Sequence, residues 1–252
     1  MTLRAALCVV LVSVLAGCVS SGGSNPMSTD KGRDAARQAY VQLGLGYLQQ
    51  GMAEQAKVPL GKALELDQDA PDTHAALALV FQREMEFELA EQSFQKALAA
   101  RPHDARTLNN YASLLFEQQR YQDAYTLFHK AAADNLYPER SRVYENLGIT
   151  ALKLGQPETA RGYLVKALRL NPKQPRALLE MAELSYQDRQ YVPAREFYDR
   201  FSLLSGQNAR SLLLGARLAA VFDDRATPAS HGQQLKRLYP GTPEYQQYLS
   251  EQ

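Results

Sequence analysis

The sequence predicts an all-α fold, a right-handed superhelix (solenoid) of six helix–turn–helix repeats. Two observations support this prediction. Small residues recur at intervals of 34 residues, with one interval of 36, between Gly44 and Ala216. The apolar residues of each interval are spaced as on one face of an α-helix, and no long stretch alternates apolar and polar residues as a half-buried strand does. A fixed period of this length indicates stacked repeats, in which each unit buries its apolar face against its neighbours.

Three ladders of residues set the period. The first is formed by the pairs Leu43-Gly44, Leu77-Ala78, Tyr111-Ala112, Leu147-Gly148, Met181-Ala182 and Gly215-Ala216. The second is Ala56, Ala90, Ala124, Ala160 and Ala194, and the third is Ala63, Ala97, Ala131, Ala167 and Phe201. Large residues lie between the last two ladders at Leu60, Phe94, Phe128, Leu164 and Tyr198. This pattern resembles the tetratricopeptide repeat, in which a small residue at the eighth position lets two antiparallel helices approach closely.

The ladders place the repeats at residues 37–70, 71–104, 105–138, 141–174, 175–208 and 209–242. We expect one continuous repeat domain over residues 30–252. Glu139 and Arg140 are an insertion after the third repeat, which explains the interval of 36. The sixth repeat departs from the pattern, because Pro228 replaces the ladder alanine and Gly232 replaces the large residue. Terminal repeats are often atypical, since only one of their sides is covered.

The N-terminus has the layout of a secretory signal peptide over residues 1–17. Arg4 precedes an apolar run over residues 5–16, which is too short to span a bilayer core as a helix. The run ends in Leu15-Ala16-Gly17-Cys18, which resembles a bacterial lipobox, where the Cys thiol carries a diacylglycerol thioether. The sequence therefore predicts a lipoprotein that begins at Cys18. The alternative is an ordinary cleaved signal peptide with an incidental Cys.

Lipidation at Cys18 determines the expected location of the protein. A covalent diacylglycerol and an N-linked acyl chain such as palmitate are expected on this residue, with no other cofactor. Stable anchoring in a membrane takes more than one acyl chain. Residues 18–29 are rich in Gly and Ser and are expected to form a flexible lipidated tether. By resemblance to Gram-negative lipoproteins, the absence of Asp after Cys18 implies export to the outer membrane, at its periplasmic face.

Composition and motifs argue against catalysis, metal binding and nucleic-acid binding. The chain has 28 Lys and Arg against 27 Asp and Glu, so it lacks the basic field that nucleic acid requires. Both Cys residues lie in the first 18 positions, which leaves no Cys-ligated zinc site. No His lies three or four residues from another, and neither G-x-S-x-G nor H-E-x-x-H occurs. We therefore predict a protein that is not an enzyme, has no small-molecule substrate and holds no metal.

The groove of the superhelix is the expected binding surface. In the tetratricopeptide family, the second, fifth, ninth and twelfth positions of each first helix point into the groove. In repeat one these include Val41, Leu45 and Leu48, and Leu79 of repeat two extends this apolar stripe. An exposed apolar stripe is a candidate docking site for an amphipathic helix or an apolar strand of a partner. The alternative is that residues 28–36 fold back and cover the stripe.

Polar groove residues follow farther along the chain. The same four positions of repeats three to six are Arg106, Asn109, Ser113, Phe116, Arg142, Glu145, Ile149, Leu152, Arg176, Leu179, Glu183, Tyr186, Arg210, Leu213, Arg217 and Ala220. Asn110 and Asn146 occupy equivalent places in repeats three and four, where their amides could hold a peptide backbone. The groove arginines from repeat four onward could bind carboxylates. Ordinary solvated surface is the alternative for all of these polar residues.

Longer segments carry a closer resemblance. They are LAGCVSSG, DKGRDAARQAYVQLGLGYLQQG, NNYASLLFEQQRYQDAY, LYPERSRVYENLG, YVPAREFYDRF, GQNARSLLLGARLA and QLKRLYPG. These segments resemble the type IV pilus biogenesis lipoproteins (pilotins) of the PilF/PilW type over the whole expected mature chain. The resemblance implies a monomeric outer-membrane lipoprotein that binds subunits of the pilus secretin. It also implies that the protein promotes secretin localisation and multimer assembly, as pilus biogenesis and twitching motility require.

Two other functions are compatible with the residues. One is an outer-membrane repeat lipoprotein that serves as a scaffold for β-barrel insertion or for cell-wall machinery, and co-purifying partners would distinguish it from a pilotin. The other is a hydrolase that uses its repeats for docking. A hydrolase requires a pocket that contains an acid or a base of perturbed pKa.

Overall fold

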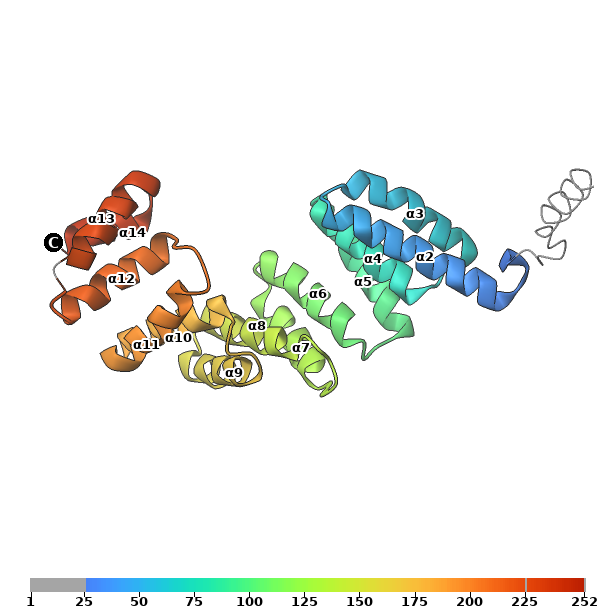
Figure 1. The fold of residues 1–252 in the computed structure, drawn as a ribbon. Helices are drawn as coiled ribbons and strands as arrows, with labels where there is room; N and C mark the ends of the chain where they lie inside the picture. The colour runs from blue at the N-terminus through green and yellow to red at the C-terminus, as the bar shows by residue number, and fades with distance from the viewer. Residues whose placement is uncertain (1–25, 225, 252) are drawn as a thin grey trace, which may run out of the picture. The chain divides into compact units, whose positions relative to one another are not determined.

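The structure is a computed structural model that describes residues 26–224 and 226–251 (Figure 1). The chain divides into two compact units, residues 1–85 and residues 86–252. The described elements are the 3-10 helix η1 (Pro26–Ser28) and the α-helices α2 (Asp30–Gln49), α3 (Ala53–Leu66), α4 (Pro71–Arg83), α5 (Phe87–Ala100), α6 (Ala105–Glu117), α7 (Tyr121–Ala132), α8 (Arg140–Lys153), α9 (Pro157–Leu170), α10 (Pro175–Gln187), α11 (Tyr191–Ser202), α12 (Ala209–Val221), α13 (Ala226–Leu238) and α14 (Pro243–Ser250). Over these ranges, no helix is both long enough and apolar enough to cross a membrane.

The predicted repeats and the observed helices share one register. Helices α4, α6, α10 and α12 begin at the first residue of a predicted repeat. Helix α8 begins at Arg140, inside the two-residue insertion. Pro71, Pro157 and Pro175 each begin a helix, where the missing proline N–H would have had no intrahelical partner. The predicted all-α repeat fold is confirmed.

The turn between the two helices of each repeat has the same backbone geometry. One residue of each turn adopts a left-handed conformation, with φ between 56° and 78°: Gly51, Met85, Gln119, Gly155, Arg189 and Asp223. Their spacing reproduces the period of the ladders, including the single interval of 36. Backbone hydrogen bonds close the turn, as where the Arg120 N–H donates to the Leu115 carbonyl at 2.9 Å. Because only two of the six residues are glycine, four side chains hold a conformation that L-residues disfavour.

We expect Gln119→Gly to stabilise the protein by about 0.5–1 kcal/mol. Glycine avoids the Cβ strain of the left-handed conformation, which costs about 1–2 kcal/mol. Glycine also has more conformational entropy in the unfolded chain, and this offsets part of the stabilisation. The Gln119 side chain is exposed, so its removal costs little packing. The reciprocal change, Gly155→Ala, is expected to destabilise by about 1 kcal/mol. Thermal unfolding followed by circular dichroism checks both, and a Gln119→Gly variant that melts below wild type contradicts the prediction.

The first unit packs α2, α3 and α4 around a small apolar core (Figure 1). The buried core residues are Val41, Ala56, Leu60, Ala63, Ala76 and Val80. Helix α2 begins about two turns before the predicted first repeat, where the Thr29 hydroxyl accepts from the Gly32 N–H at 3.0 Å. The buried Arg37 guanidinium, directly after these added turns, donates to the Asp72 carboxylate and joins α2 to the start of α4. Residues 26–29 are thus η1 and a helix cap, which corrects this part of the predicted flexible tether.

Two glycines of the first ladder allow paired helices to make contact. A Cβ added to Gly148 of α8 would lie 2.7 Å from two carbons of Leu164 on α9, and one added to Gly44 of α2 would lie 2.6 Å from Leu60 on α3. In repeats two, three and five the ladder residue is Ala, and the large residue at the position of Leu164 is aromatic. A branched leucine thus accompanies glycine and a flat ring accompanies alanine, which keeps the helices of each repeat close-packed.

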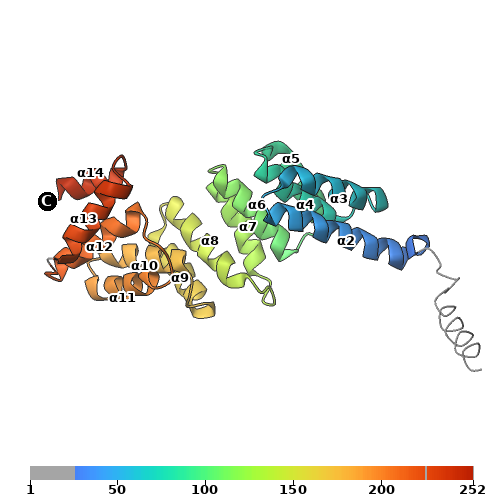
Figure 2. The same ribbon diagram turned by 45° about the horizontal axis from the view of Figure 1, so that its top comes forward.

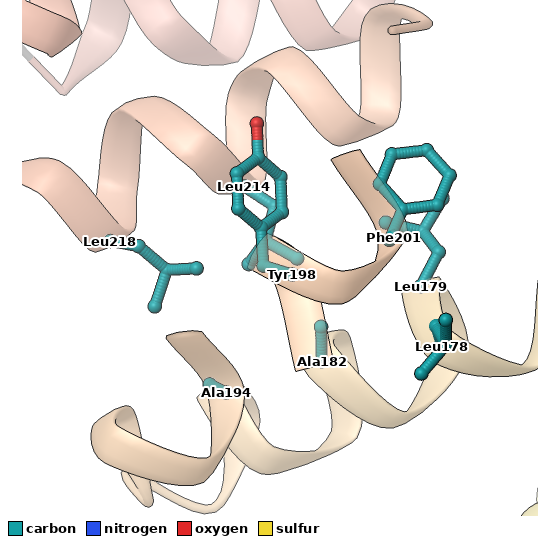
Figure 3. Close-up of a cluster of buried hydrophobic side chains, with 8 residues drawn as sticks. All are labelled: Leu178, Leu179, Ala182, Ala194, Tyr198, Phe201, Leu214 and Leu218. Carbon is teal, nitrogen blue, oxygen red and sulfur yellow. The ribbon is translucent and has the colours of Figure 1, made fainter. Parts of the chain in front are cut away.

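The second unit stacks α5 to α14 in chain order, and each helix contacts the next (Figures 1 and 2). The first helices of neighbouring repeats also contact one another, α6 with α8, α8 with α10 and α10 with α12. Figure 3 shows a core that is shared by three helices: Leu178, Leu179 and Ala182 of α10, Ala194, Tyr198 and Phe201 of α11, and Leu214 and Leu218 of α12. Because adjacent repeats share their cores in this way, their first helices line one face of the unit.

Helix α14 lies beyond the predicted repeats, which end at residue 242. It begins at Pro243, 34 residues after the start of α12, so it has the phase of a first helix of a seventh repeat. The Tyr248 phenol of α14 occupies the place where a Cβ on Gly232 of α13 would lie. The large residue that the sixth repeat lacks is therefore replaced by a side chain from α14, which covers the end of the stack.

Candidate functional site

The apolar stripe of the first unit consists of Leu45 and Leu48 on α2 and Leu79 on α4, here called the unit-one surface. All three side chains are half-buried, and Leu45 and Leu48 pack against the core of the unit. Val41 is only 4% exposed and belongs to that core. The sequence pattern placed Val41 in the groove beside the leucines, whereas the structure buries it between α2 and the helices packed on it. Val41 thus packs beneath the unit-one surface and has almost no exposed area that a partner could contact.

Residues 28–36 do not fold back over the unit-one surface. Residues 30–36 are the first turns of α2 and continue without a break into the turns that carry Leu45 and Leu48. A helix cannot cover a later part of itself, so residues 30–36 do not cover Leu45 and Leu48, and the predicted alternative of a covered stripe is excluded for these two residues. The half-buried leucines are therefore not closed off by the chain that precedes them over residues 26–36.

A cavity of about 280 Å³ opens in the second unit among the first helices of repeats three, four and five, and is called the unit-two cavity. Its lining is Ser113, Phe116 and Glu117 of α6, Phe128 of α7, Asn146 and Ile149 of α8, and Arg176 of α10. The structure thus brings together four residues that the repeat pattern assigned to the groove, at positions 113, 116, 149 and 176. Asn146 lies in the wall as expected, whereas Asn110 does not line the cavity.

Asn146 is held in place by a neighbouring asparagine. Its Nδ2 donates to Asn109 Oδ1 at 3.2 Å, and the Ser113 hydroxyl donates to the Asn109 carbonyl at 2.9 Å. Asn109 is buried, so it fixes the orientation of the Asn146 amide. Asn110 follows one residue later, which rotates its side chain by about 100° around the helix. Asn109, itself one of the four groove positions of repeat three, is therefore the residue of that repeat that contacts Asn146, while Asn110, at the position equivalent to Asn146, does not line the cavity.

A carboxylate is buried beside the unit-two cavity. Glu145 of α8 is 6% exposed, and its Oε2 accepts from the Ala177 N–H at 3.2 Å. Burial raises the pKa of the Glu145 carboxyl, and the charge of Arg176 opposes that rise. Arg176 Nη1 lies 3.7 Å from Glu145 Oε1, which is too long for a hydrogen bond. The Arg176 side chain is 61% exposed at the rim of the cavity.

A second cavity, of about 230 Å³, lies at the C-terminal end of the same unit. It is lined by Glu183, Tyr186, Gln187, Arg210, Leu213, Leu214, Arg217, Glu244 and Gln247. Arg210 Nη1 donates to Glu180 at 3.0 Å, and Arg217 Nε donates to Glu251 at 2.9 Å. Burial acts to lower the pKa of Arg210, but its hydrogen bonds to Glu180 and Glu183 outweigh burial and raise it. Both arginines of this cavity are thus neutralised within the chain.

The side chains of these surfaces offer binding chemistry. The unit-two cavity combines aromatic and aliphatic walls with an amide, the exposed guanidinium of Arg176 and the carboxylate of Glu117. In the ranges that the structure describes, no histidine lines either cavity, and no cluster of three His, Cys, Asp or Glu side chains could hold a metal ion. A partner therefore meets apolar area, hydrogen-bonding amides and the positive charge of Arg176.

Some residues of the site escape the repeat pattern. Phe128 and Glu117 reach the unit-two cavity although neither holds one of the four groove positions. Glu244 and Gln247 come from α14, which the interval of 34 residues from Ala209 to Pro243 could have predicted. The predicted lipidation residue, Cys18, lies outside the described residues.

Comparisons with known proteins agree with the repeat architecture. Family profiles described as Tetratricopeptide repeat match residues 38–69, 103–173 and 151–218. The type IV pilus assembly protein PilF of Pseudomonas aeruginosa (strain PAO1) is 60% identical to this chain over 251 residues, which covers 100% of both chains.

Two solved structures are also similar. One, from a functional characterization of Pseudomonas aeruginosa PilF, is 60% identical with a TM-score of 0.86 and covers 88% of this chain and 100% of its own. The other is PilW, described as a widely conserved type IV pilus biogenesis factor. It is 27% identical with a TM-score of 0.72 and covers 84% of this chain and 98% of its own. The sequence similarity to PilF and the structural similarity to PilF and PilW each cover most of this chain, far more than a single repeat.

Proposed function

Because this chain belongs to the family of type IV pilus assembly proteins that includes PilF, we propose that it is a pilotin, an outer-membrane lipoprotein that binds subunits of the pilus secretin and promotes their localisation and assembly into multimers. The family places the chain in type IV pilus biogenesis and in contact with components of the pilus machinery. The observation that carries the proposal is the 60% identity over the full length of both chains. The proposed role is non-enzymatic and is required for twitching motility.

The proposed membrane anchor is acylated Cys18. Each buried CH₂ group of an acyl chain contributes about 0.8 kcal/mol to membrane binding, so a residue that carries two or three chains is effectively not released. Helix η1 begins at Pro26, so the linking segment is eight residues long and spans at most about 30 Å. The start of the first unit therefore stays close to the outer membrane, where the secretin has to assemble.

The proposed secretin-binding site is the unit-one surface. Burying an apolar side chain fully contributes about 1.5–3 kcal/mol, and the half-buried leucines contribute a part of this each. An apolar strand or an amphipathic helix of the secretin subunit has the matching chemistry. Leu79 lies on α4 of the same compact unit, and in the proposal it extends the surface beyond α2.

We expect Leu79→Asp to weaken binding of the secretin subunit at least about tenfold. An aspartate enclosed by apolar surface loses its hydration without gaining a partner, which is costly. Leu79 suits this test because it lies outside the core cluster against which Leu45 and Leu48 pack, so the substitution is compatible with folding. The measurement is the amount of secretin subunit that the immobilised protein retains from detergent-solubilised envelopes.

Val58→Asp is the matched control for this test. Val58 lies on α3 of the same unit and is 65% exposed, away from the unit-one surface. Its variant is expected to retain as much secretin as wild type, and circular dichroism should show equal helicity for all three proteins. If the Leu79 variant retains as much secretin subunit as wild type, or if both variants lose it equally, the result argues against the unit-one surface as the binding site.

A further inference from the structure

Arginine recurs at the second position of four consecutive repeats of the second unit: Arg106, Arg142, Arg176 and Arg210. In the last of these, the guanidinium binds two carboxylates at once. Arg210 donates to Glu180 and to Glu183, which are the sixth and ninth residues of the preceding repeat. In these charge-assisted pairs, the N–H groups of one planar guanidinium donate to two different carboxylates.

Arg176 holds the same position one repeat earlier but lacks these partners. The residues equivalent to Glu180 and Glu183 are Asn146 and Ile149, and both line the unit-two cavity. Among the described residues, the Arg176 guanidinium has one carboxylate within 4.0 Å, that of Glu145 at 3.7 Å, and it donates no hydrogen bond. The cavity thus lies where the next repeat places two carboxylates.

We propose that the unit-two cavity binds an extended segment of a partner protein in which a bulky apolar residue is followed by Asp or Glu. The acidic side chain accepts hydrogen bonds from Arg176, in the place that Glu180 and Glu183 hold at Arg210. The apolar side chain packs against Phe116 and Ile149 in the cavity wall. Asn146, whose Nδ2 is bound to Asn109, presents its Oδ1 to a backbone N–H of the segment.

The dimensions of the site and the exposed guanidinium of Arg176 at its rim favour this occupant, and the other charged residue of the lining is Glu117. A volume of about 280 Å³ accepts one large apolar side chain and not a helix, so the segment has to be extended. Glu145 is held by the Ala177 N–H and does not have to move, because the Arg210 example shows that one guanidinium can serve two carboxylates. The proposal rests on repeats three to five and is independent of the unit-one surface.

Binding of short fluorescein-labelled peptides, measured by fluorescence anisotropy on the purified protein, tests the proposal. The probes carry Leu-Asp, Leu-Asn or Ser-Asp between Gly-Ser flanks. Wild type is expected to bind the Leu-Asp peptide about tenfold more tightly than either of the other two, since the first comparison removes a charge-assisted hydrogen bond and the second removes the apolar contact. Equal affinity for Leu-Asp and Leu-Asn overturns the proposal.

Three variants test whether the preference for Leu-Asp over Leu-Asn arises in the unit-two cavity. Arg176→Gln is expected to bind Leu-Asp and Leu-Asn equally. Asn146→Glu supplies an internal carboxylate like Glu180 and is expected to abolish the preference while Arg176 is still present, which keeps the test valid if Arg176→Gln impairs folding. Arg142→Gln, at the same repeat position but outside the cavity lining, is expected to keep the full preference. A preference that survives both cavity variants, or that Arg142→Gln removes, overturns the proposed site.

Discussion

A Cys18→Ser variant is expected to lose its retention in the outer membrane and to leave the secretin in monomeric form. Serine cannot form the diacylglycerol thioether, and without acyl chains the repeat domain has no large apolar contribution to membrane binding. Secretin subunits bound to the soluble variant would then remain away from the membrane in which they assemble. Density-gradient fractionation of envelopes measures the location, and gel electrophoresis of unheated samples measures the multimer.

Cys8→Ser provides the matched control for lipidation. Cys8 lies inside the apolar run of the predicted signal peptide and would be removed with it. This variant is therefore expected to fractionate and to support multimers as wild type does. Normal outer-membrane location and normal multimer levels in the Cys18 variant would show that the anchor does not depend on that thiol.

A Gly148→Leu variant is expected to lose at least about 3 kcal/mol of stability, which lowers the melting temperature by about 10 °C in a protein of this size. Gly148 is buried where α8 crosses α9, and an added Cβ would already lie 2.7 Å from Leu164 and 3.3 Å from the Ala160 carbonyl oxygen. The backbone oxygen cannot move aside, so the two helices of repeat four have to separate. Thermal unfolding followed by circular dichroism measures the loss.

Gly162→Leu makes the same change at a site without contacts. Gly162 is an exposed residue of α9, in the same repeat, and an added Cβ there meets nothing within 4 Å. Leucine is the better helix former, so this variant is expected to be more stable than wild type by about 0.5–1 kcal/mol. A Gly148 variant that melts like the Gly162 variant would contradict close packing of α8 on α9.

The helix register could be predicted because repeats one to five obey the same packing constraint. A large residue on one helix requires a small one on its partner, so the ladders mark each pair of helices in turn. The extended start of α2 lies before the first repeat and has no periodic counterpart, whereas α14 keeps the interval of 34 residues from the start of α12. Their contacts with other helices, such as Arg37 with Asp72 and Tyr248 with the space at Gly232, become visible only when the helices are packed.

The site could be predicted in part for a related reason. Helical geometry fixes which positions face the groove, and four of them do line the unit-two cavity. Burial at the edge of the groove depends on neighbouring helices, so Val41 is a core residue and Asn110 does not line the cavity that Asn146 lines. Among the described residues, the Arg176 guanidinium donates no hydrogen bond to a carboxylate. This feature depends on distances between helices, which the repeat pattern does not contain.

Site-specific photo-crosslinking tests the central claim most directly, namely that the unit-one surface holds the secretin subunit. Benzoylphenylalanine would replace Leu79 in one variant and Val58 in another, in cells that assemble pili. Irradiation is expected to join the protein to the secretin subunit from the Leu79 position and to give little such product from the Val58 position. No secretin adduct from the Leu79 position, or equal adducts from both, would contradict the account.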